Sequence, residues 1–457
     1  MITESIFKSY DIRGVYPDEL NQEAARLIAQ AYLQIVSRKL NKKVEELKLV
    51  IGRDIRKSSE PLFKSVVEVL LKSGVEVDDI GLVSANDYYF AVGFYGYDGG
   101  LMLTASHNPP EYGGIKMILG AGGPKRPISF LSGHEIHEEI KQRGLNIEPV
   151  QAEGKLSEKD VSQDHINHIL SFINPSQIKP FKIVVDAGNG MAGLLTHKLL
   201  GRLPVKMVGL FTEPDGNFSN RPPNPLTPGA SDKLAKKVLE EKADFGAMFD
   251  VDGDRIFLVD ERGSLIRGDM VLLLLAKAFL AEHPGCSIVY NLICSQAVPE
   301  LIAQWGGKAV RSEVGYINLA RHMREENGLM SGEVSGHFAF KDNYYADSAF
   351  IALVLAIKTI SADGRPLSKI IKDYSLYARG DEMNFEVGDI KAELAKIRRA
   401  YKDNLRDEID GLTFEFGDWW FNVRPSNTEP LLRVTVEAKA EKQLKQKQAE
   451  IKKLIEA

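Results

Sequence analysis

The feature that most constrains the fold is an alternation of short apolar runs with longer segments of helical periodicity. Residues 47–51 predict a buried strand, and the apolar positions that follow Pro61 recur on one helical face. Residues 182–186 and 287–290 predict further strands of the same kind. Strands that alternate with helices form largely parallel sheets with crossover connections. The pattern therefore predicts an α/β architecture.

The pattern changes beyond Asp381, where two helical segments flank several short strands. This arrangement predicts an α+β domain rather than another crossover unit. The length of 457 residues corresponds to about three domains at roughly 150 residues each. The terminal change of pattern adds a smaller fourth domain. The predicted domains are residues 1–149, 150–256, 257–367 and 368–457.

The charge balance and the apolar segments exclude two classes of partner. The chain carries 58 Lys and Arg against 63 Asp and Glu, so we expect no nucleic-acid partner. The most apolar stretch falls well short of the ~20 residues that cross a bilayer, so we expect no membrane partner. Two cysteines, Cys286 and Cys294, and a start without a signal-peptide pattern predict a cytoplasmic protein.

Residues 250–255 contain three aspartates at alternate positions, entered from an apolar strand. Asp250, Asp252 and Asp254 can converge their oxygens on a hard divalent cation such as Mg²⁺. The alternative is an Asp-rich polar turn at a strand end. An EF-hand calcium loop is rejected, because Arg255 replaces its required glycine and both flanks are predicted strands.

Residues 104–110 follow another apolar strand and place Ser106 and His107 on a tight loop. Asn108 precedes a proline and cannot continue as helix, and ligands of α/β sheets bind at such strand ends. Ser106 is therefore a candidate nucleophile, with an ordinary turn serine as the alternative. A Ser-His-Asp hydrolase is weakly supported, because the G-x-S-x-G motif is absent around Ser106.

Residues 424–430, with Arg433 nearby, combine guanidinium groups and short polar side chains on a proline-bounded loop. Such a set suits a phosphate dianion, although a solvated turn explains the segment equally well. A Walker A loop is absent, so ATP binding has no motif support. Residues 332–337 and 9–14 are weaker polar patterns when each is taken alone.

The five motifs and their order along the chain resemble those of the α-D-phosphohexomutase superfamily, specifically its phosphomannomutase/phosphoglucomutase branch. The resemblance covers essentially the whole chain and rests on residues 10–14, 104–109, 250–255, 332–337 and 424–430. It implies three similar α/β domains with mixed sheets and a smaller α+β C-terminal domain around one central cleft. In that family each domain supplies one part of a single site.

The resemblance also implies an activity on small-molecule hexose phosphates. The chain is expected to interconvert hexose 1-phosphate and hexose 6-phosphate, with mannose and/or glucose as the sugar. Ser106 is implied as a phosphoserine, and Mg²⁺ is implied as bound by this group and by Asp250, Asp252 and Asp254. A hexose 1,6-bisphosphate is the implied intermediate and activator. A loose phosphoryl-transfer transition state needs such positioning and charge neutralisation.

The remaining site residues are carried over from the family by their motifs. Arg13, Lys116 and Arg255 are implied around the reacting phosphoryl group, and Lys116 or His337 is implied in proton transfer. Glu333 and Ser335 are implied as ligands of the sugar hydroxyls. The implied phosphate-binding residues are Arg424, Ser426, Asn427 and Thr428, with Arg433 as a weaker candidate.

Two positions depart from the family pattern and leave the substrate preference open. Tyr316, expected to contact the substrate, replaces a typical histidine, and Ile293 stands nearest to a typical lysine. The alternatives are a phosphoglucosamine mutase and, less favoured, a non-catalytic sugar-phosphate binding protein. The Glu-Val-Ser sequence within residues 332–337 favours the mannose/glucose branch. We also expect a monomer or homodimer whose terminal domain hinges from about Pro366.

Overall fold

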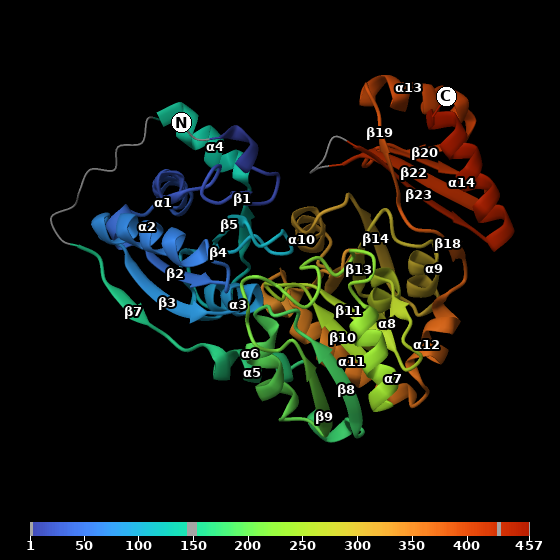
Figure 1. Cartoon of the computed structure of the whole chain (residues 1–457), viewed down its shortest axis with the longest axis horizontal. Helices are drawn as coiled ribbons and strands as arrows, with labels where there is room; N and C mark the ends of the chain where they lie inside the picture. Colours follow the sequence, from blue (N-terminus) through green and yellow to red (C-terminus); the bar gives the residue numbers. More distant parts are fainter. Residues whose placement is uncertain (1–2, 144–152, 427–430, 457) are drawn as a thin grey trace. The chain divides into compact units, whose positions relative to one another are not determined.

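The computed structural model describes residues 3–143, 153–426 and 431–456 (Figure 1). The chain divides into two compact units. The first unit comprises Met1–Arg267 and Ser335–Ser368, and the second comprises Gly268–Val334 and Lys369–Ala457. The predicted hinge near Pro366 lies close to one of the points at which the chain passes between the units. Hinge motion itself stays a prediction.

The first unit begins with a seven-stranded mixed sheet in the order β1-β5-β4-β2-β3-β7, with β6 paired to β5. Its strands are β1 (Ile12–Val15), β2 (Lys48–Arg53), β3 (Glu76–Leu82), β4 (Gly99–Leu103), β5 (Tyr112–Leu119), β6 (Ser129–Leu131) and β7 (Leu156–Glu158). β2 runs parallel to β3 and β4, whereas β5 runs antiparallel to β4 and β1.

Helices pack on both faces of this sheet. The helices are α1 (Gln22–Leu40), α2 (Ser59–Lys72), α3 (Ala85–Tyr95) and α4 (Gly133–Arg143). Leu49 and Ile51 belong to a core that also contains residues of α1 and α2, whereas Val50 belongs to a second core with residues of α3. Because side chains alternate along a strand, a buried strand between two helical layers reads as a continuous apolar run. The strand predicted at residues 47–51 and the helix predicted around Pro61 are confirmed.

A second mixed sheet in the first unit has the order β12-β11-β10-β8-β9. Its strands are β8 (Phe181–Asp186), β9 (Val205–Leu210), β10 (Phe245–Phe249), β11 (Ile256–Asp260) and β12 (Leu265–Ile266). The same unit contains α5 (Ser162–Leu170), α6 (Ala192–Leu200), α7 (Asp232–Glu241), β16 (Phe338–Phe340), β17 (Ala346–Asp347) and α11 (Ala349–Asp363). β8 is parallel to β9 and β10, and β11 returns antiparallel to β10. The boundary predicted between residues 256 and 257 therefore falls within β11.

The second unit combines a parallel three-stranded segment with an antiparallel sheet. The first part contains α8 (Gly268–Glu282), β13 (Ser287–Asn291), α9 (Ala297–Gln304), β14 (Lys308–Ser312), α10 (Tyr316–Glu325), β15 (Met330–Gly332) and α12 (Leu367–Tyr374), whose first two residues belong to the first unit. The second part contains β18 (Ala378–Arg379), β19 (Met383–Glu386), α13 (Ile390–Ala400), β20 (Leu405–Asp407), β21 (Leu412–Glu415), β22 (Trp419–Pro425), β23 (Leu431–Ala438) and α14 (Glu441–Glu456).

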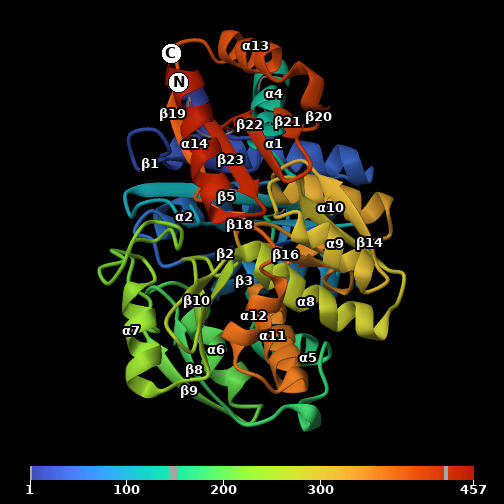
Figure 2. The ribbon, with the colours of Figure 1, turned by 90° about the vertical axis from the view of Figure 1, so that its right-hand side faces the viewer.

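The C-terminal part has the α+β organisation that the sequence predicts. Its six strands pair antiparallel, with β23 next to β18, β19 and β22. α14 lies along this sheet (Figures 1 and 2) and places Leu444, Ile451 and Ile455 in a core with Phe414 and Phe421. An amphipathic helix that covers one face of an antiparallel sheet leaves the other face available for a site.

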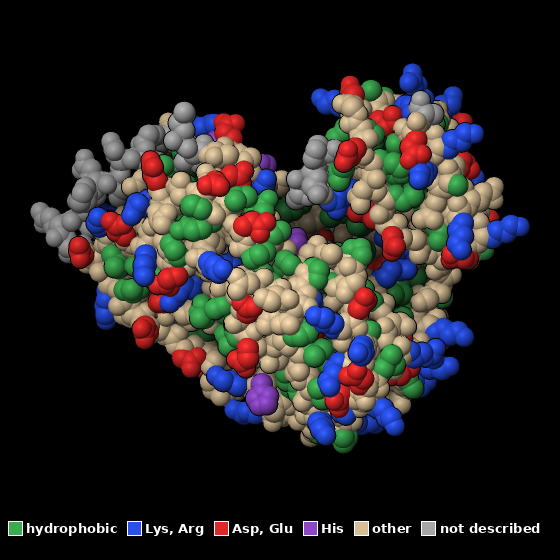
Figure 3. Space-filling model, viewed as in Figure 1, with side chains coloured by type: hydrophobic (Ala, Val, Ile, Leu, Met, Phe, Trp, Pro, Cys, Tyr) green, Lys and Arg blue, Asp and Glu red, His purple; other side chains and the backbone are tan. Residues whose placement is uncertain are grey.

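In the part of the chain that the structure describes, no helix combines the length and the apolar character needed to cross a bilayer. Basic and acidic side chains are interspersed over the face shown in Figure 3. A mixed distribution of this kind differs from the basic stripe of a typical nucleic-acid-binding surface.

His168 on α5 makes the fold sensitive to acid. Its ring stacks on Tyr344 and contacts Asn343, and burial lowers the pKa of His168 from 6.5 to about 4. Between these values the unfolded chain binds a proton that the folded chain does not, so stability falls as the pH drops below 6.5. We expect His168 to contribute roughly 2 kcal/mol to the stability lost between pH 7 and pH 4.5.

Urea unfolding of the wild type and of His168→Gln at both pH values measures this contribution. The variant should lose less stability on acidification than the wild type. Identical pH dependence in the two proteins would show that His168 is not the responsible group.

Candidate functional site

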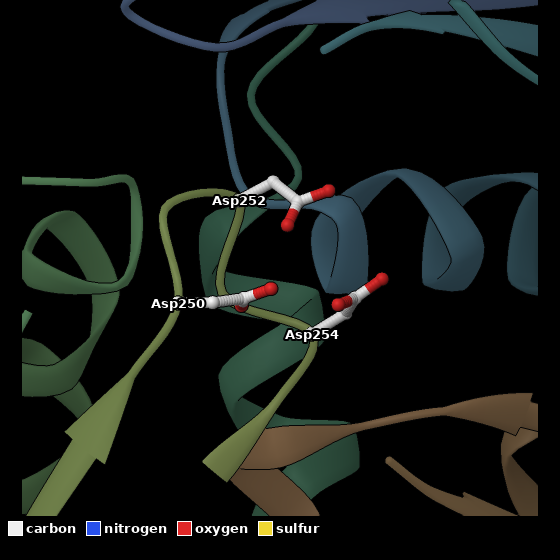
Figure 4. A group of neighbouring side chains, drawn as sticks. All are labelled: Asp250, Asp252 and Asp254. Carbon is white, nitrogen blue, oxygen red and sulfur yellow. The ribbon is translucent and has the colours of Figure 1, made fainter. Parts of the chain in front are cut away.

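Three aspartates occupy the loop between β10 and β11, at the carboxyl end of β10. Ligand oxygens of Asp250, Asp252 and Asp254 all lie within 4.8 Å of one another, and the three residues are at most 1% exposed. Figure 4 shows their carboxylates on the same side of the loop. Gly253 turns the loop with φ +75°, a conformation that favours glycine. Strands flank the loop on both sides, so the rejection of an EF-hand is confirmed.

Neighbouring cationic groups offset the charge of the three carboxylates unequally. Burial and the neighbouring Asp252 and Asp254 raise the pKa of Asp250 to about 7. Burial opposes ionisation of Asp254 as well, but the Lys116 ammonium holds the pKa of that carboxyl well below its ordinary value. Lys116 Nζ lies 2.7 Å from Asp252 Oδ2 and 2.5 Å from Asp254 Oδ2. The Lys116 ammonium thus contacts two of the three carboxylates, and Arg255 Nε lies 3.6 Å from Asp250 Oδ2.

The aspartate loop is held in place by the amino ends of two helices. The backbone N–H of Ala85, at the start of α3, donates to Asp252 O over 2.8 Å, and Met191 N donates to Val251 O over 2.7 Å. The Asn86 amide donates to Gly253 O and accepts from Ala349 N over 2.9 Å. Asn86 is fully buried and was not among the residues predicted from the sequence.

Ser106 lies beside the aspartate loop, 144 residues earlier in the chain. It follows β4 with φ +49°, which is uncommon for a residue other than glycine, and it is 1% exposed. Its hydroxyl donates to Asp250 Oδ2 over 3.1 Å and lies 3.3 Å from His107 Nδ1. Burial and the positive charge of Arg255 lower the pKa of His107 well below its ordinary value. The structure thus brings Ser106 next to the aspartate loop.

Arg56 fixes the backbone of the Ser106 loop. Its guanidinium donates to the carbonyl oxygens of Ser106, Asn108 and Pro109 over 2.5, 2.6 and 2.6 Å. It also pairs with Asp54 at 3.2 Å, and both side chains are fully buried. Arg56 was missed in the sequence, although its place just after the carboxyl end of β2 was a usable signal.

The other predicted residues of the first unit gather around the two loops. Arg13 bonds Asp11 and donates to Asn108 Oδ1 over 2.7 Å. Arg255 Nε donates to His337 Nε2 over 3.2 Å, and His337 Nδ1 lies 3.0 Å from Ser335 Oγ. With Nε2 as an acceptor, the Nδ1 proton is assigned to the bond with Ser335. Ser335 Oγ therefore accepts a hydrogen bond from His337 Nδ1.

The second unit holds Glu333, Tyr316 and Ile293. The Asn291 amide donates to Glu333 Oε2 over 3.1 Å, and both side chains are buried. Tyr316 is the first residue of α10 and is half-buried. Ile293 is buried just after β13.

The predicted phosphate-binding arginines lie opposite each other on neighbouring strands. Arg424 on β22 is the register partner of Arg433 on β23. Glu382, which the sequence reasoning missed, contacts both guanidinium groups at 3.0 and 3.3 Å. Arg424 is 4% exposed and its Nε atom is buried without a hydrogen-bond partner. Ser426 is half-buried, and Asn427 and Thr428 lie outside the described residues.

Family models match nearly the whole chain in four consecutive segments. Three are described as α/β/α domains I, II and III of phosphoglucomutase/phosphomannomutase, and they match residues 4–143, 163–263 and 267–377. The fourth, the C-terminal domain of the same family, matches residues 382–454.

Relatives over the full length agree with these matches. Proteins described as phosphohexose mutases from Xanthomonas campestris pv. campestris are 38% identical over 445 residues, 96% of each chain. The phosphomannomutase of Methanocaldococcus jannaschii is 36% identical over 456 residues, 98% of this chain and 97% of that one. A solved phosphoglucomutase/phosphomannomutase family protein from Burkholderia thailandensis is 30% identical, with a TM-score of 0.88, and covers 100% of this chain and 98% of its own.

These matches, over nearly the whole chain, define the fold of a phosphohexose mutase. The chain belongs to the phosphoglucomutase/phosphomannomutase family. The predicted family and fold class, three α/β domains followed by a smaller C-terminal domain, are confirmed. The individual domain boundaries and the roles of the site residues stay predictions.

Removing the Arg56 guanidinium tests its role in the Ser106 loop. Arg56→Met should lower the free energy of unfolding by about 3–5 kcal/mol, because Asp54 is left as an unpaired buried charge. Lys57→Met, an exposed neighbour, serves as the matched control and should change stability by less than about 0.5 kcal/mol. Urea unfolding measures both variants, and equal stability of the two would contradict the assignment.

Proposed function

We propose that the chain is a phosphohexomutase that interconverts the 1-phosphate and 6-phosphate of mannose and/or glucose. The observation that carries this proposal is the 3.1 Å contact between the Ser106 hydroxyl and Asp250 in the aspartate triplet. Full-length relatives named phosphomannomutase and phosphohexose mutases support the same reaction and disfavour the two alternatives.

The proposed chemistry consists of two phosphoryl transfers through Ser106. Phosphoserine 106 first gives its phosphoryl group to the free hydroxyl of a hexose monophosphate, so its P–Oγ bond breaks as a P–O bond to the sugar forms. The hydroxyl proton passes to a nearby base, for which His337 and the neutral amine form of Lys116 are the candidates. The resulting hexose 1,6-bisphosphate reverses its orientation, and Ser106 takes back the other phosphate. Phosphoserine is regenerated and the hexose phosphate isomer is released.

The cationic side chains of the first unit suit this transfer. Arg13, Lys116 and Arg255 would offset the negative charge that spreads over the phosphoryl oxygens in a loose transition state. Arg13 and Lys116 are also fixed by carboxylate contacts, which keeps their positions set before substrate arrives. A site of this kind needs no strong general base.

The second unit supplies groups suited to the rest of the substrate. Arg424 and Arg433 are paired directly across two neighbouring strands and present two guanidinium groups. Such a pair suits the substrate phosphate that is not being transferred. Glu333, oriented by Asn291, is proposed to accept hydrogen bonds from sugar hydroxyls. We propose Ser335, Tyr316, Ser426, Asn427 and Thr428 as further substrate contacts. The described contacts leave open which of them select the sugar.

The aspartate triplet is proposed to bind Mg²⁺ together with phosphoserine 106. Asp252 Oδ1 is buried without a hydrogen-bond partner, and oxygens of all three carboxylates converge, so the residues fit a hard cation with oxygen ligands. When bound, the ion would neutralise charge on the transferring phosphoryl group.

The free state of Cys286 and Cys294 supports a cytoplasmic enzyme. A monomer or homodimer remains the expected assembly.

Coupled assays with three substrates test the proposed function. With Mg²⁺ and glucose 1,6-bisphosphate present, mannose 1-phosphate or glucose 1-phosphate should give a higher kcat/KM than glucosamine 1-phosphate. Ser106→Ala should reduce turnover at least about a thousandfold, because the phosphoryl acceptor is lost. The highest kcat/KM for glucosamine 1-phosphate would instead identify a phosphoglucosamine mutase. Sugar-phosphate binding without turnover would identify a non-catalytic protein.

Metal binding is testable without turnover. Asp252→Asn removes one charged ligand and should weaken Mg²⁺ binding at least about tenfold in calorimetric titrations. Asp232→Asn, an exposed aspartate at the start of α7, removes the same charge elsewhere and should leave the affinity unchanged. Equal Mg²⁺ affinity in Asp252→Asn and the wild type, at comparable thermal stability, would rule out Asp252 as a ligand.

A further inference from the structure

A small cavity of about 70 Å³ lies in the second unit, where α9 approaches the C-terminal sheet. Gln296 and Glu300 line it from the first turn of α9, and Trp420 and Glu437 line it from β22 and β23. Arg424 lies four residues beyond Trp420 on β22, about 13 Å away at the usual strand rise. The cavity is therefore separate from the arginines proposed to bind phosphate.

Acidic side chains set the charge of this cavity. Its described lining contains four carboxylates and no lysine, arginine or histidine; the carboxylates are those of Glu300, Glu415, Asp418 and Glu437. Over the described ranges of the chain, Glu415 pairs with Arg406 at 3.2 Å, and the other three carboxylates have no ion-pair partner. The cavity thus carries net negative charge.

Strand pairing places two of these carboxylates beside one indole ring. Glu415 on β21 is the register partner of Trp420 on β22, and Trp420 is in turn the register partner of Glu437 on β23. Directly opposed residues of antiparallel strands share a face of the sheet, with their Cβ atoms about 4.5–5.5 Å apart. The three side chains therefore form one row across the sheet, with the aromatic ring in the middle.

Glu437 keeps one carboxylate oxygen free at this cavity. The residue is fully buried, and its Oε1 accepts from Gln296 N over 2.8 Å and from Trp420 Nε1 over 2.9 Å. Its Oε2 is buried and has no hydrogen-bond partner. Arg379, the register partner of Glu437 on β18, contacts Asp269 at 3.6 Å instead. Because buried charges are normally paired and hydrogen-bonded, the free oxygen suits a cationic donor.

Tyr377 shows that the carboxylates act on the same space. Its hydroxyl donates to Glu300 Oε1 over 2.6 Å, and its side chain lines the cavity. Burial raises the pKa of Tyr377, and the Glu300 hydrogen bond and the charges of Glu437 and Glu415 raise it further. Negative charge from α9, β21 and β23 thus converges on one hydroxyl at the cavity wall.

The geometry favours an organic cation over a metal ion. Among the described residues, the aspartate triplet is the one group of three such side chains whose ligand oxygens lie within 4.8 Å of one another. The carboxylates of the cavity are therefore too dispersed to surround a hard ion, which takes several oxygen ligands at once. The rings of Trp420 and Tyr377 also line the cavity, and aromatic rings attract organic cations.

We propose that this cavity binds a primary alkylammonium group, with its N–H donors on Glu437 Oε2 and its alkyl stem against Trp420 and Tyr377. An ammonium group offers three donors and a compact positive charge. A volume of about 70 Å³ holds roughly five to seven water-sized groups, which matches a short alkyl chain with a terminal ammonium. The proposal does not depend on the mutase reaction.

Titration of the full chain with n-butylammonium tests the proposal, with n-butanol as a neutral counterpart of the same length. Calorimetry should detect saturable binding of one n-butylammonium per chain. Tryptophan fluorescence should change in parallel, because Trp419 and Trp420, two of the three tryptophans, line the cavity. n-Butanol should bind at least about tenfold more weakly, because it carries no charge to pair with Glu437.

Variants of the carboxylates locate the site. Glu437→Gln keeps an acceptor for Gln296 and Trp420 but removes the charge, and it should weaken n-butylammonium binding at least about tenfold. Glu300→Gln/Asp418→Asn changes exposed groups only and should weaken it at least about threefold, which tests the site independently of the buried position. Glu386→Gln, an exposed glutamate on β19, removes the same charge elsewhere on the sheet and should bind as the wild type does.

A second probe separates two sources of the ammonium group. Nα-acetyl-lysine amide carries the same group on a peptide backbone. Weaker binding of this probe than of n-butylammonium supports a free amine as the ligand, whereas tighter binding supports a lysine side chain of a protein. Equal affinity for n-butylammonium and n-butanol, or wild-type affinity in folded Glu437→Gln, would overturn the site.

Discussion

Mutual repulsion among three buried carboxylates is the constraint on which the rest of the site depends. Ligand oxygens of Asp250, Asp252 and Asp254 lie within 4.8 Å of one another. Burial disfavours the charged form of these carboxyl groups. Lys116 offsets part of this charge and thereby keeps Asp254 ionised. A divalent cation shared with a phosphoserine would offset the remainder. Convergent buried carboxylates of this kind suit a divalent cation.

The surrounding fold keeps this loop in place by contacts between segments distant in sequence. The start of α3 bonds two carbonyls of the aspartate loop through Ala85 and Asn86, and Asn86 also joins it to α11. Arg56 does the same for the Ser106 loop through three carbonyl oxygens. Because both loops are held by buried groups, Ser106 and Asp250 meet at hydrogen-bond distance.

Apolar periodicity predicted the strands and the C-terminal change of architecture, and short motifs predicted the Ser106 and Asp250 loops. Both signals are encoded by residues that are neighbours in the sequence. Arg56, Asn86 and Glu382 escaped prediction because their roles arise from contacts with residues far away in the chain. The engagement of Ser335 by His337 depends equally on the tertiary structure. Asn427 and Thr428 stay predictions from the motif alone.

Ser106 is proposed to carry the phosphoryl group between the two ends of the hexose. Peptide mapping of the purified protein locates the phosphate. The enzyme is then labelled with ³²P and reacted with unlabelled glucose 6-phosphate in a single turnover, which follows the transfer directly. The account predicts phosphate on Ser106 and appearance of the label in glucose 1,6-bisphosphate at a rate no slower than kcat. Full mutase turnover with no phosphate on Ser106, or with label that never leaves the protein, would contradict it.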